Sequence, residues 1–156
     1  MVGNSGGCTA LVWVLSAAIA LFDVLPLAAR AEMPVSALSA GVHLIQAEVA
    51  RTGPSRQEGL MYRRKLGPNR GMLFVFPESA RHCMWMRNTY IPLSVAFMDE
   101  QGNILSIDDM QPETENNHCA ARPARYALEM SYRWFKQRGI AAGQRIAGVE
   151  GAGEAQ

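Results

Sequence analysis

The sequence predicts an α+β fold, in the form of a small β-rich domain with a curled antiparallel or mixed sheet and two short helices. Three observations lead to this prediction. Apolar residues gather in many short segments of the kind that form strands, and only two segments carry helix-capping signals. Turn-forming residues separate most of these segments, and the chain beyond its first apolar stretch has the length of one domain.

Residues 1–31 have the features of a removable export signal. The apolar stretch at residues 10–27 is interrupted by Asp23 and Pro26 and is followed by the sequence Ala-Arg-Ala at 29–31, which fits a cleavage site. Its uninterrupted part is shorter than the roughly 20 apolar residues that span a bilayer. We therefore predict a cleaved leader and no membrane attachment after cleavage.

The mature protein is expected to begin at Glu32 and to be periplasmic or secreted. The alternative is that translation starts at Met33, which would remove the leader. The leader contains one Arg and one Asp, so the net charge of the remainder stays at +1. Because no long run of one charge is present, we expect no nucleic-acid partner.

The rest of the chain is expected to form a single domain at residues 42–150. Residues 32–41 are small and polar and contain Pro34 and Gly41, which predicts a flexible tether. Residues 151–156 are expected to be a disordered tail.

The first predicted helix begins after Thr52, a capping residue, with Pro54 in its first turn. Gly59 is expected inside this helix, where close backbone packing would explain a glycine. The basic residues 63–65 are placed at the C-terminal end of the helix, before Gly67-Pro68 stops it.

The second predicted helix is capped by Ser131 and carries Trp134 and Phe135, with Gly139 at its C′ position. Strand patterns predict the remaining elements. They occupy residues 42–49, 72–76, 82–86, 93–97, 104–107, 124–130 and 145–149. Residues 100–103 are expected to form a hairpin turn, and residues 112–121 a polar loop long enough to be functional.

Two cysteines remain after Cys8 is lost with the leader. An even pair in an oxidising compartment favours a disulfide, so we predict a bond between Cys83 and Cys119. A thiol nucleophile or a metal ligand is the alternative, but neither has C-x-x-C spacing to support it.

Several short blocks of sequence resemble a known family. They are Gly59-Leu60-Met61 with Arg63, Gly71-Met72-Leu73-Phe74 with Phe76, Trp85-Met86 with Asn88-Thr89, Ile91-Pro92-Leu93, Phe97 with Asp99, and Pro123-Ala124 with Tyr126 and Leu128-Glu129. Over residues 49–149 the chain resembles the bacterial and archaeal family DUF192, also catalogued as an uncharacterised protein family. The resemblance implies a small β-rich domain that is often exported. It supplies no enzymatic activity.

Residues 85–89 give the strongest local concentration of binding chemistry. Trp85 offers an aromatic face and Arg87 a fixed cation, while Asn88 and Thr89 offer hydrogen bonds beside a turn. A purely structural interpretation is equally concrete. Asn88 and Thr89 would then bond to turn backbone groups, with Trp85 in the core and Arg87 on the surface.

Glu129 lies in a predicted strand, on the face opposite Tyr126 and Leu128. We expect it to pair across strands with Arg63 or Arg87. The candidate ligand-binding residues are therefore Arg63, Trp85, Arg87, Asn88, Thr89 and Glu129. A catalytic role for Glu129 together with Asp99 depends on their separation, which the sequence does not give.

Strand alternation would also place His82, Met84 and Met86 on one face, and these are ligand types suited to Cu(I). Methionine is an ordinary filler of irregular cores, however, so the copper site is an alternative and not the main expectation. No phosphate-binding loop, nucleophile elbow or zinc spacing is present, and we expect no cofactor.

These observations favour an exported binding or accessory module for a small polar or anionic ligand in the cell envelope, and we do not expect an enzyme. Three alternatives remain open. They are a small envelope enzyme that uses Asp99 or Glu129 as acid or base, a domain that binds an envelope protein through a strand edge or apolar patch, and the Cu(I) site.

Overall fold

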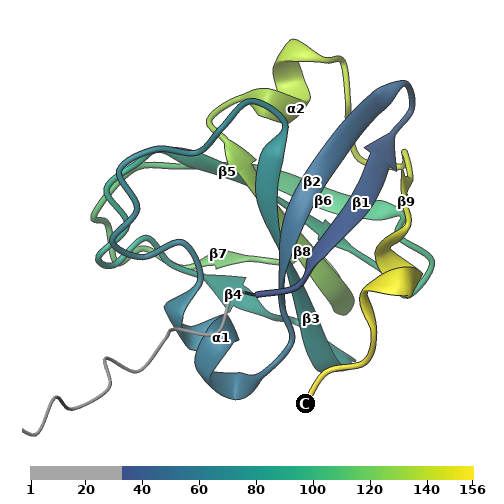
Figure 1. The fold of residues 1–156 in the computed structure, drawn as a ribbon, viewed down its shortest axis with the longest axis horizontal. Coiled ribbons are helices and arrows are strands. Elements are labelled where there is room, and N and C mark those ends of the chain that lie inside the picture. Colours follow the sequence, from purple (N-terminus) through teal and green to yellow (C-terminus); the bar gives the residue numbers. More distant parts are fainter. Residues whose placement is uncertain (1–32) are drawn as a thin grey trace, which may run out of the picture. The chain divides into compact units, whose positions relative to one another are not determined.

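The computed structural model describes residues 33–156, and the leader predicted at residues 1–31 lies outside this range. The described chain forms a seven-stranded sheet and a two-stranded sheet, with two α-helices and one 3-10 helix (Figure 1). In chain order the elements are β1 (Val35–Ala40), β2 (His43–Ala50), α1 (Gly53–Glu58), β3 (Arg70–Ala80), β4 (Cys83–Met84), β5 (Leu93–Met98), β6 (Ile104–Met110), β7 (His118–Cys119), β8 (Ala124–Ser131), α2 (Trp134–Gln137), β9 (Ile146–Ala147) and the 3-10 helix η1 (Val149–Ala152). The predicted α+β class, with a mixed sheet and two short helices, is confirmed.

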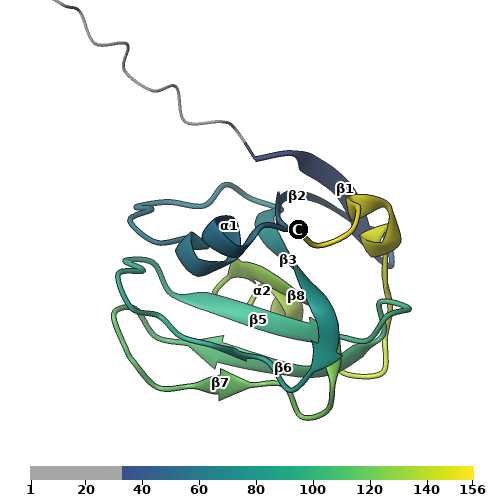
Figure 2. The same cartoon turned by 90° about the horizontal axis from the view of Figure 1, so that it is seen from below.

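The large sheet has the strand order β6-β5-β8-β3-β2-β1-β9. Its pairs are antiparallel except for β2 and β3, which run parallel side by side. Parallel neighbours need a crossover of a dozen or more residues, and residues 51–69 supply it and carry α1. In Figure 2 the sheet curls, with β1 and β2 above, β5 and β6 below, and β3 and β8 between them.

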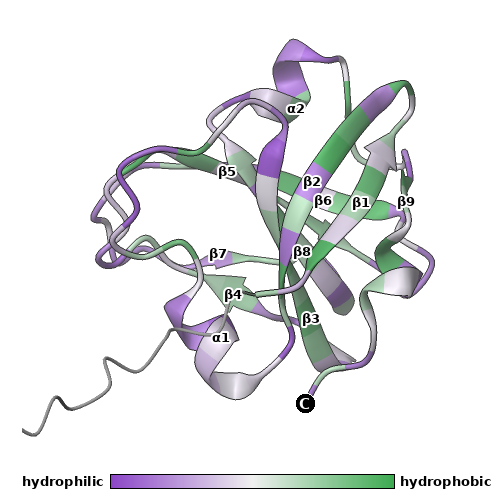
Figure 3. Cartoon of the chain, in the orientation of Figure 1, coloured by the Kyte–Doolittle hydropathy of each residue, from purple (hydrophilic) through white to green (hydrophobic). Residues whose placement is uncertain are grey.

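Each face of the large sheet carries its own hydrophobic core. On one face α2 contributes Trp134 and Phe135, and η1 contributes Val149. On the other face the strands pack against residues of the connections, including Leu60 and Met86. Figure 3 shows apolar residues concentrated along the strands, as burial of both faces requires.

Residues 35–40 form β1, so the prediction of a flexible tether at 32–41 is wrong. The strand pairs with β2 over its whole length, from Val35 opposite Glu48 to Ala40 opposite His43. Leu38 is buried in the core and so helps to hold the strand in place. The small residues around it conceal this role in the sequence.

The end of the chain is also ordered by contacts, contrary to the expected disordered tail at 151–156. Ala152 is buried within η1. The Gln156 amide donates a hydrogen bond to the Arg51 carbonyl at 2.7 Å. Within residues 33–156 no helix is long and apolar enough to cross a membrane.

The first helix starts as predicted but ends earlier. Thr52 caps it reciprocally with Ser55, through Ser55 N to Thr52 Oγ1 at 3.2 Å and Thr52 N to Ser55 Oγ at 3.0 Å. Gly59 ends the helix because it adopts φ +50°, so the basic residues 63–65 lie beyond the helix and not in its last turn. The expected close packing at Gly59 is present, since an added Cβ would lie 3.1 Å from Cζ of Phe74.

The second helix is not capped by Ser131, which belongs to β8. Its N-cap is Arg133, at φ +59°, with no capping side chain of its own. The buried Ser94 of β5 takes over this role across the sheet, where its Oγ accepts a hydrogen bond from the Arg133 amide at 2.7 Å. Gly139 follows the helix at φ +66°, as predicted.

Candidate functional site

Glu129 lies in the middle of β8, flanked in the sheet by Met72 of β3 and Val95 of β5. The alternation of β8 turns Glu129 toward the second core, on the same face as both of these neighbours. Only 3% of the residue is exposed. A titratable carboxyl group is therefore built into an apolar layer.

A close backbone contact fixes this part of the sheet. Gly71 in β3 is opposite Met130 in β8, and an added Cβ at position 71 would lie 2.5 Å from the Glu129 carbonyl oxygen. Because Gly71 has no side chain, β8 can approach β3 closely at Glu129.

The carboxyl of Glu129 has no hydrogen-bond or ion-pair partner among residues 33–156. Burial disfavours the charged form and raises the pKa of Glu129 to about 8. The group is therefore mainly a neutral acid at pH 7, with one proton that it can donate.

A narrow cavity of about 30 Å³ opens onto this carboxyl. Its walls come from the first helix and the residues after it, from β3, and from the chain that follows β4. The lining residues are 56–61, Phe74, Met84, Trp85, Thr89 and Glu129. Of the six residues expected to bind a ligand, this cavity unites Trp85, Thr89 and Glu129.

The connection 60–69 and the turn after β4 are joined by hydrogen bonds that hold the cavity walls together. The Tyr62 amide donates to the Asn88 carbonyl at 2.8 Å, and Asn88 Nδ2 donates to the Tyr62 hydroxyl at 3.2 Å. The Thr89 amide donates to the Met86 carbonyl at 3.0 Å, which closes a turn with Asn88 at φ +57°. Asn88 is therefore a turn residue, but its side chain bonds to the Tyr62 hydroxyl and not to the turn backbone as its structural interpretation expected.

Trp85 and Arg87 lie at the surface beside the cavity. Trp85 is 44% exposed, so it does not fill the core as its structural interpretation expected. The Arg87 guanidinium carbon lies 5.8 Å from the centre of the Trp85 ring, and Arg87 Nε lies 3.8 Å from Glu115 Oε1. Arg87 therefore does not reach Glu129.

Arg63 is committed to a different carboxylate. Its Nη1 and Nη2 donate to Oε1 and Oε2 of Glu48, each at 2.6 Å, in a bidentate pair between the crossover and β2. The hydrogen bonds from Arg63 to Glu48 raise the pKa of the guanidinium above its ordinary value. The expected pairing of Glu129 with Arg63 or Arg87 is therefore wrong, because both arginines have acidic partners elsewhere.

Asp99 does not form an acid–base pair with Glu129. Glu129 is opposite Val95, and Asp99 lies four residues further along the chain, about 13 Å away at strand spacing. Burial tends to raise the pKa of Asp99, but hydrogen bonds from the Asn103 side chain and from the amides of Asn103 and Gln101 outweigh it and lower the pKa. Asp99 therefore organises the predicted hairpin turn at 100–103.

The Cu(I) alternative gains no support from the placement of its three residues. The His82 ring stacks on Phe76 with centroids 3.7 Å apart, and His82 Nε2 lies 3.0 Å from the Glu78 carbonyl oxygen. Met86 is fully buried in the core, as a packing residue would be. In the described part of the chain no group of three or more His, Cys, Asp or Glu residues could hold a metal ion.

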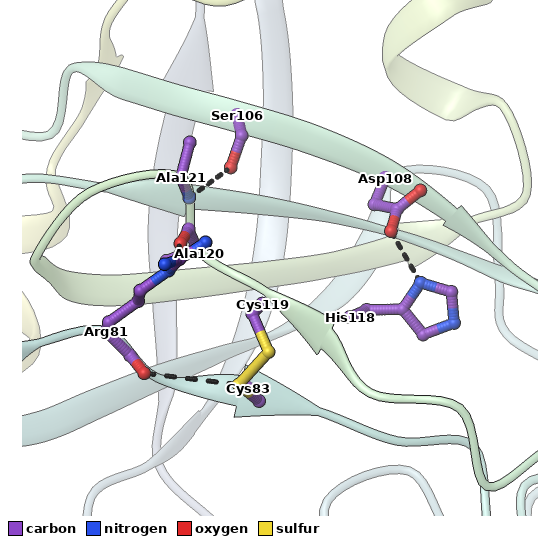
Figure 4. The surroundings of a disulfide bond; sticks show 8 residues. All are labelled: Arg81, Cys83, Ser106, Asp108, His118, Cys119, Ala120 and Ala121. Atoms are coloured by element: carbon purple, nitrogen blue, oxygen red, sulfur yellow. Dashed lines mark hydrogen bonds and ion pairs between the residues drawn. A yellow bond between two sulfur atoms is a disulfide. The ribbon is translucent and has the colours of Figure 1, made fainter.

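The structure contains the disulfide between Cys83 and Cys119 that the sequence predicted. The two residues are register partners in the small sheet formed by β4 and β7. Figure 4 shows the bond together with a contact of 2.5 Å between His118 Nδ1 and Asp108 Oδ2, which ties β7 to β6. The disulfide thereby connects the strand that precedes Trp85 to the rest of the fold.

Sequence reasoning missed two parts of this site. It did not include Glu48 of β2, the partner of Arg63, because an isolated acidic residue in a strand gives no signal of its partner. It also did not include Leu60 and Met61 of the cavity wall, whose only sequence signal was their position beside Gly59 in the family-like block.

Comparison with known proteins places the chain in a family without adding an activity. It is similar to a protein of Sinorhizobium meliloti 1021 described as a candidate transcription regulator, with 32% identity, a TM-score of 0.74, and coverage of 78% of this chain and 99% of that one. It is also similar to a protein of unknown function from Novosphingobium aromaticivorans DSM 12444, with 29% identity, a TM-score of 0.71, and coverage of 79% and 89%. No curated protein matches the chain. The family model DUF192, described as Uncharacterized ACR, matches residues 35–148, and the chain therefore belongs to the DUF192 family.

Proposed function

We propose that this protein is an exported binding module that receives a small polar ligand in the cavity above Glu129. The observation that carries the proposal is the buried carboxyl at the floor of an open cavity, without a partner among residues 33–156. Among the described residues no fully buried side-chain nitrogen or oxygen lacks a hydrogen-bond partner, so the carboxyl oxygens of Glu129 are not sealed off and reach the cavity that the residue lines. A polar group of a ligand would supply the missing partner.

Trp85 supports the same proposal. Its exposed ring lies at the cavity and offers a flat apolar surface to the part of a ligand that stays outside. An anionic ligand, the other class expected from the sequence, has less support. Arg63 is neutralised by Glu48, and Arg87 does not line the cavity.

A thermal-shift screen of saccharides, amino acids, amines and carboxylates tests this proposal. A ligand at 100 times its Kd stabilises the folded state by about 2.7 kcal/mol, which raises Tm by several degrees. We expect at least one class to produce such a shift in the wild type. The same ligand should lose most of its effect in Trp85→Ala and Glu129→Gln.

Glu154→Gln is the matched control, because it removes an exposed carboxylate that does not line the cavity. Its ligand-induced shift should equal that of the wild type. A screen in which no compound shifts the wild type, or in which the shift survives both cavity variants, would contradict a binding role for this cavity.

Export is part of the proposal and has its own measurement. The sequence pattern of residues 1–31 and a disulfide of a kind that persists in oxidising compartments both support it. Protein recovered from the periplasm or medium of an expressing bacterium should begin at Glu32 on N-terminal sequencing. Soluble protein that retains residues 1–31, or that begins at Met33, would refute cleavage after Ala31.

A further inference from the structure

The carboxyl group of Glu129 at the cavity can be stable in two protonation states. Glu129 either keeps its proton and stays neutral, or it loses the proton and pairs with a cation. Which of these happens when a ligand binds depends on the cations within reach and on the size of the group that fits.

The arginines on this face of the sheet are already committed. Arg56 lines the cavity, but its guanidinium donates to the carbonyl oxygens of Arg51, Val75 and Gln156 at 2.5, 3.1 and 3.4 Å. Arg63 is held by both oxygens of Glu48, which lies in the same row of the sheet as Glu129, two strands away. The described chain therefore brings no cation to the carboxyl.

The acidic groups near this row also have interactions of their own. Glu58 of α1 also lines the cavity, but it takes part in an interaction of its own. Val95 of β5 lies between Glu129 of β8 and Asp108 of β6 in the sheet, and Asp108 Oδ2 contacts His118 Nδ1. No charged group of the described chain therefore compensates the Glu129 carboxyl, which leaves it available to a positive group of a ligand.

The size of the cavity restricts the group that reaches the floor. A volume of about 30 Å³ accommodates roughly one or two water-sized groups. An ammonium group is of this size, whereas a carboxylate, a phosphate or a sugar ring is larger. The walls at Leu60, Phe74 and Met84 are apolar, so they suit an alkyl chain behind the polar end.

The mouth of the cavity also attracts cations. The face of Trp85 already has the guanidinium of Arg87 over it, at 5.8 Å, and the charge of that arginine is shared with Glu115. Tyr62 and Tyr90 form a second exposed aromatic pair on the connections that bound the site, with ring centroids 6.2 Å apart, and the Arg64 guanidinium carbon lies 5.6 Å from the centre of the Tyr90 ring. Aromatic faces bind cations, and an alkylammonium ligand would here take the place of Arg87 or Arg64 over the ring that it contacts.

We propose that the cavity is specific for a primary alkylammonium group, whose nitrogen enters the cavity and forms an ion pair with the Glu129 carboxylate. This inference rests on the proposed binding function and names its ligand class. The ligand is either a free small amine or the side chain of a lysine residue, which end in the same group. Binding of R–NH₃⁺ to the neutral acid leaves the ion pair in the cavity and releases the carboxyl proton to solvent.

The proton release predicts a characteristic pH dependence. Because the pKa of Glu129 is about 8 without ligand, each pH unit below 8 weakens ammonium binding about tenfold. A neutral hydroxyl ligand would show no such trend. An anion requires the protonated acid, so its binding would be nearly constant below pH 8 and would weaken only above it.

The test is an NMR titration of the exported protein with n-butylamine, butan-1-ol and butyrate at pH 6, 7 and 8, following the Trp85 indole and Gly59 amide signals. We expect butylamine to bind about tenfold tighter at pH 7 than at pH 6, and neither of the other probes to bind comparably. Glu129→Gln should weaken butylamine at least tenfold and abolish the pH trend, while Glu154→Gln should behave as the wild type. Comparison of 1,4-diaminobutane with Nα-acetyl-lysine N-methylamide then distinguishes a free amine from a lysine side chain.

Several results would overturn this inference. Butan-1-ol binding as tightly as butylamine without a pH trend would show a neutral ligand, and it would leave the binding function intact. The same holds if a compound of another class shifts Tm while no amine binds. If neither these probes nor the wider screen gives binding, the binding function itself fails.

Discussion

Replacing Glu129 with glutamine is expected to stabilise the folded protein, and the gain should grow with pH. Burial raises the pKa of Glu129 from its ordinary value of 4.5 to about 8. Between these values the folded state holds a proton that the unfolded state has lost, so this group lowers the free energy of unfolding by about 1.4 kcal/mol per pH unit. The contribution of the protonated Glu129 to stability is fully present below pH 4.5, the pKa in the unfolded state. It is lost progressively as the pH rises to about 8, the pKa in the folded state.

Glutamine keeps the shape of the neutral acid but does not ionise. The difference in unfolding free energy between Glu129→Gln and the wild type should therefore be smallest at pH 4.5 and reach roughly 3 kcal/mol at pH 7. Urea unfolding at pH 5, 6, 7 and 8 measures it. Glu154→Gln, at an exposed position, should leave the pH dependence unchanged. A difference that does not grow with pH would mean that Glu129 is ionised and has a cationic partner in the folded protein.

Loss of the disulfide should have an effect of similar size in the opposite direction. The bond joins Cys83 to Cys119 across a sequence separation of 36 residues. In the chain-entropy account, closing such a loop in the unfolded state stabilises the folded state by about 3 to 4 kcal/mol. The double variant Cys83→Ser, Cys119→Ser should therefore unfold at a markedly lower urea concentration than the wild type.

Reduction supplies a matched comparison for this experiment. Dithiothreitol should lower the stability of the wild type to that of the double variant, and it should not affect the double variant. A wild type that loses less than 1 kcal/mol on reduction would contradict a stabilising role for the bond. The amine titration repeated on the double variant would also report whether β4 must be tied to β7 for Trp85 to hold its place beside the cavity.

The fold class and most strand positions were predictable because burial on one or both faces leaves a clear pattern in the sequence. β1 was missed because its small and polar residues provide little apolar area apart from Leu38, and their ordering comes from backbone pairing with β2. The parallel pairing of β2 and β3 was also not predictable. Strand patterns do not encode the direction of a neighbour, which depends on the path of residues 51–69.

The lining of the cavity was only partly predictable from the sequence. Trp85, Thr89 and Glu129 were identified from residue type and position, but the partners of the arginines depend on which strands lie side by side. Arg63 lies in the crossover that joins β2 to β3. It reaches Glu48 of β2 because the crossover packs back against this pair of strands, which the sequence does not reveal. The unpaired state of Glu129 follows from that choice, so sequence reasoning that looked for its arginine reached the wrong answer.

The crossover between β2 and β3 has a consequence for how such a domain diversifies. Residues 51–69 lie outside the sheet ladder, yet they supply one wall of the cavity, while Glu129 on the central strand β8 supplies its floor. Connections tolerate changes of length and sequence far better than the strands they join. Exchange of this one segment would therefore reshape the cavity while the buried acid beneath it stays unchanged.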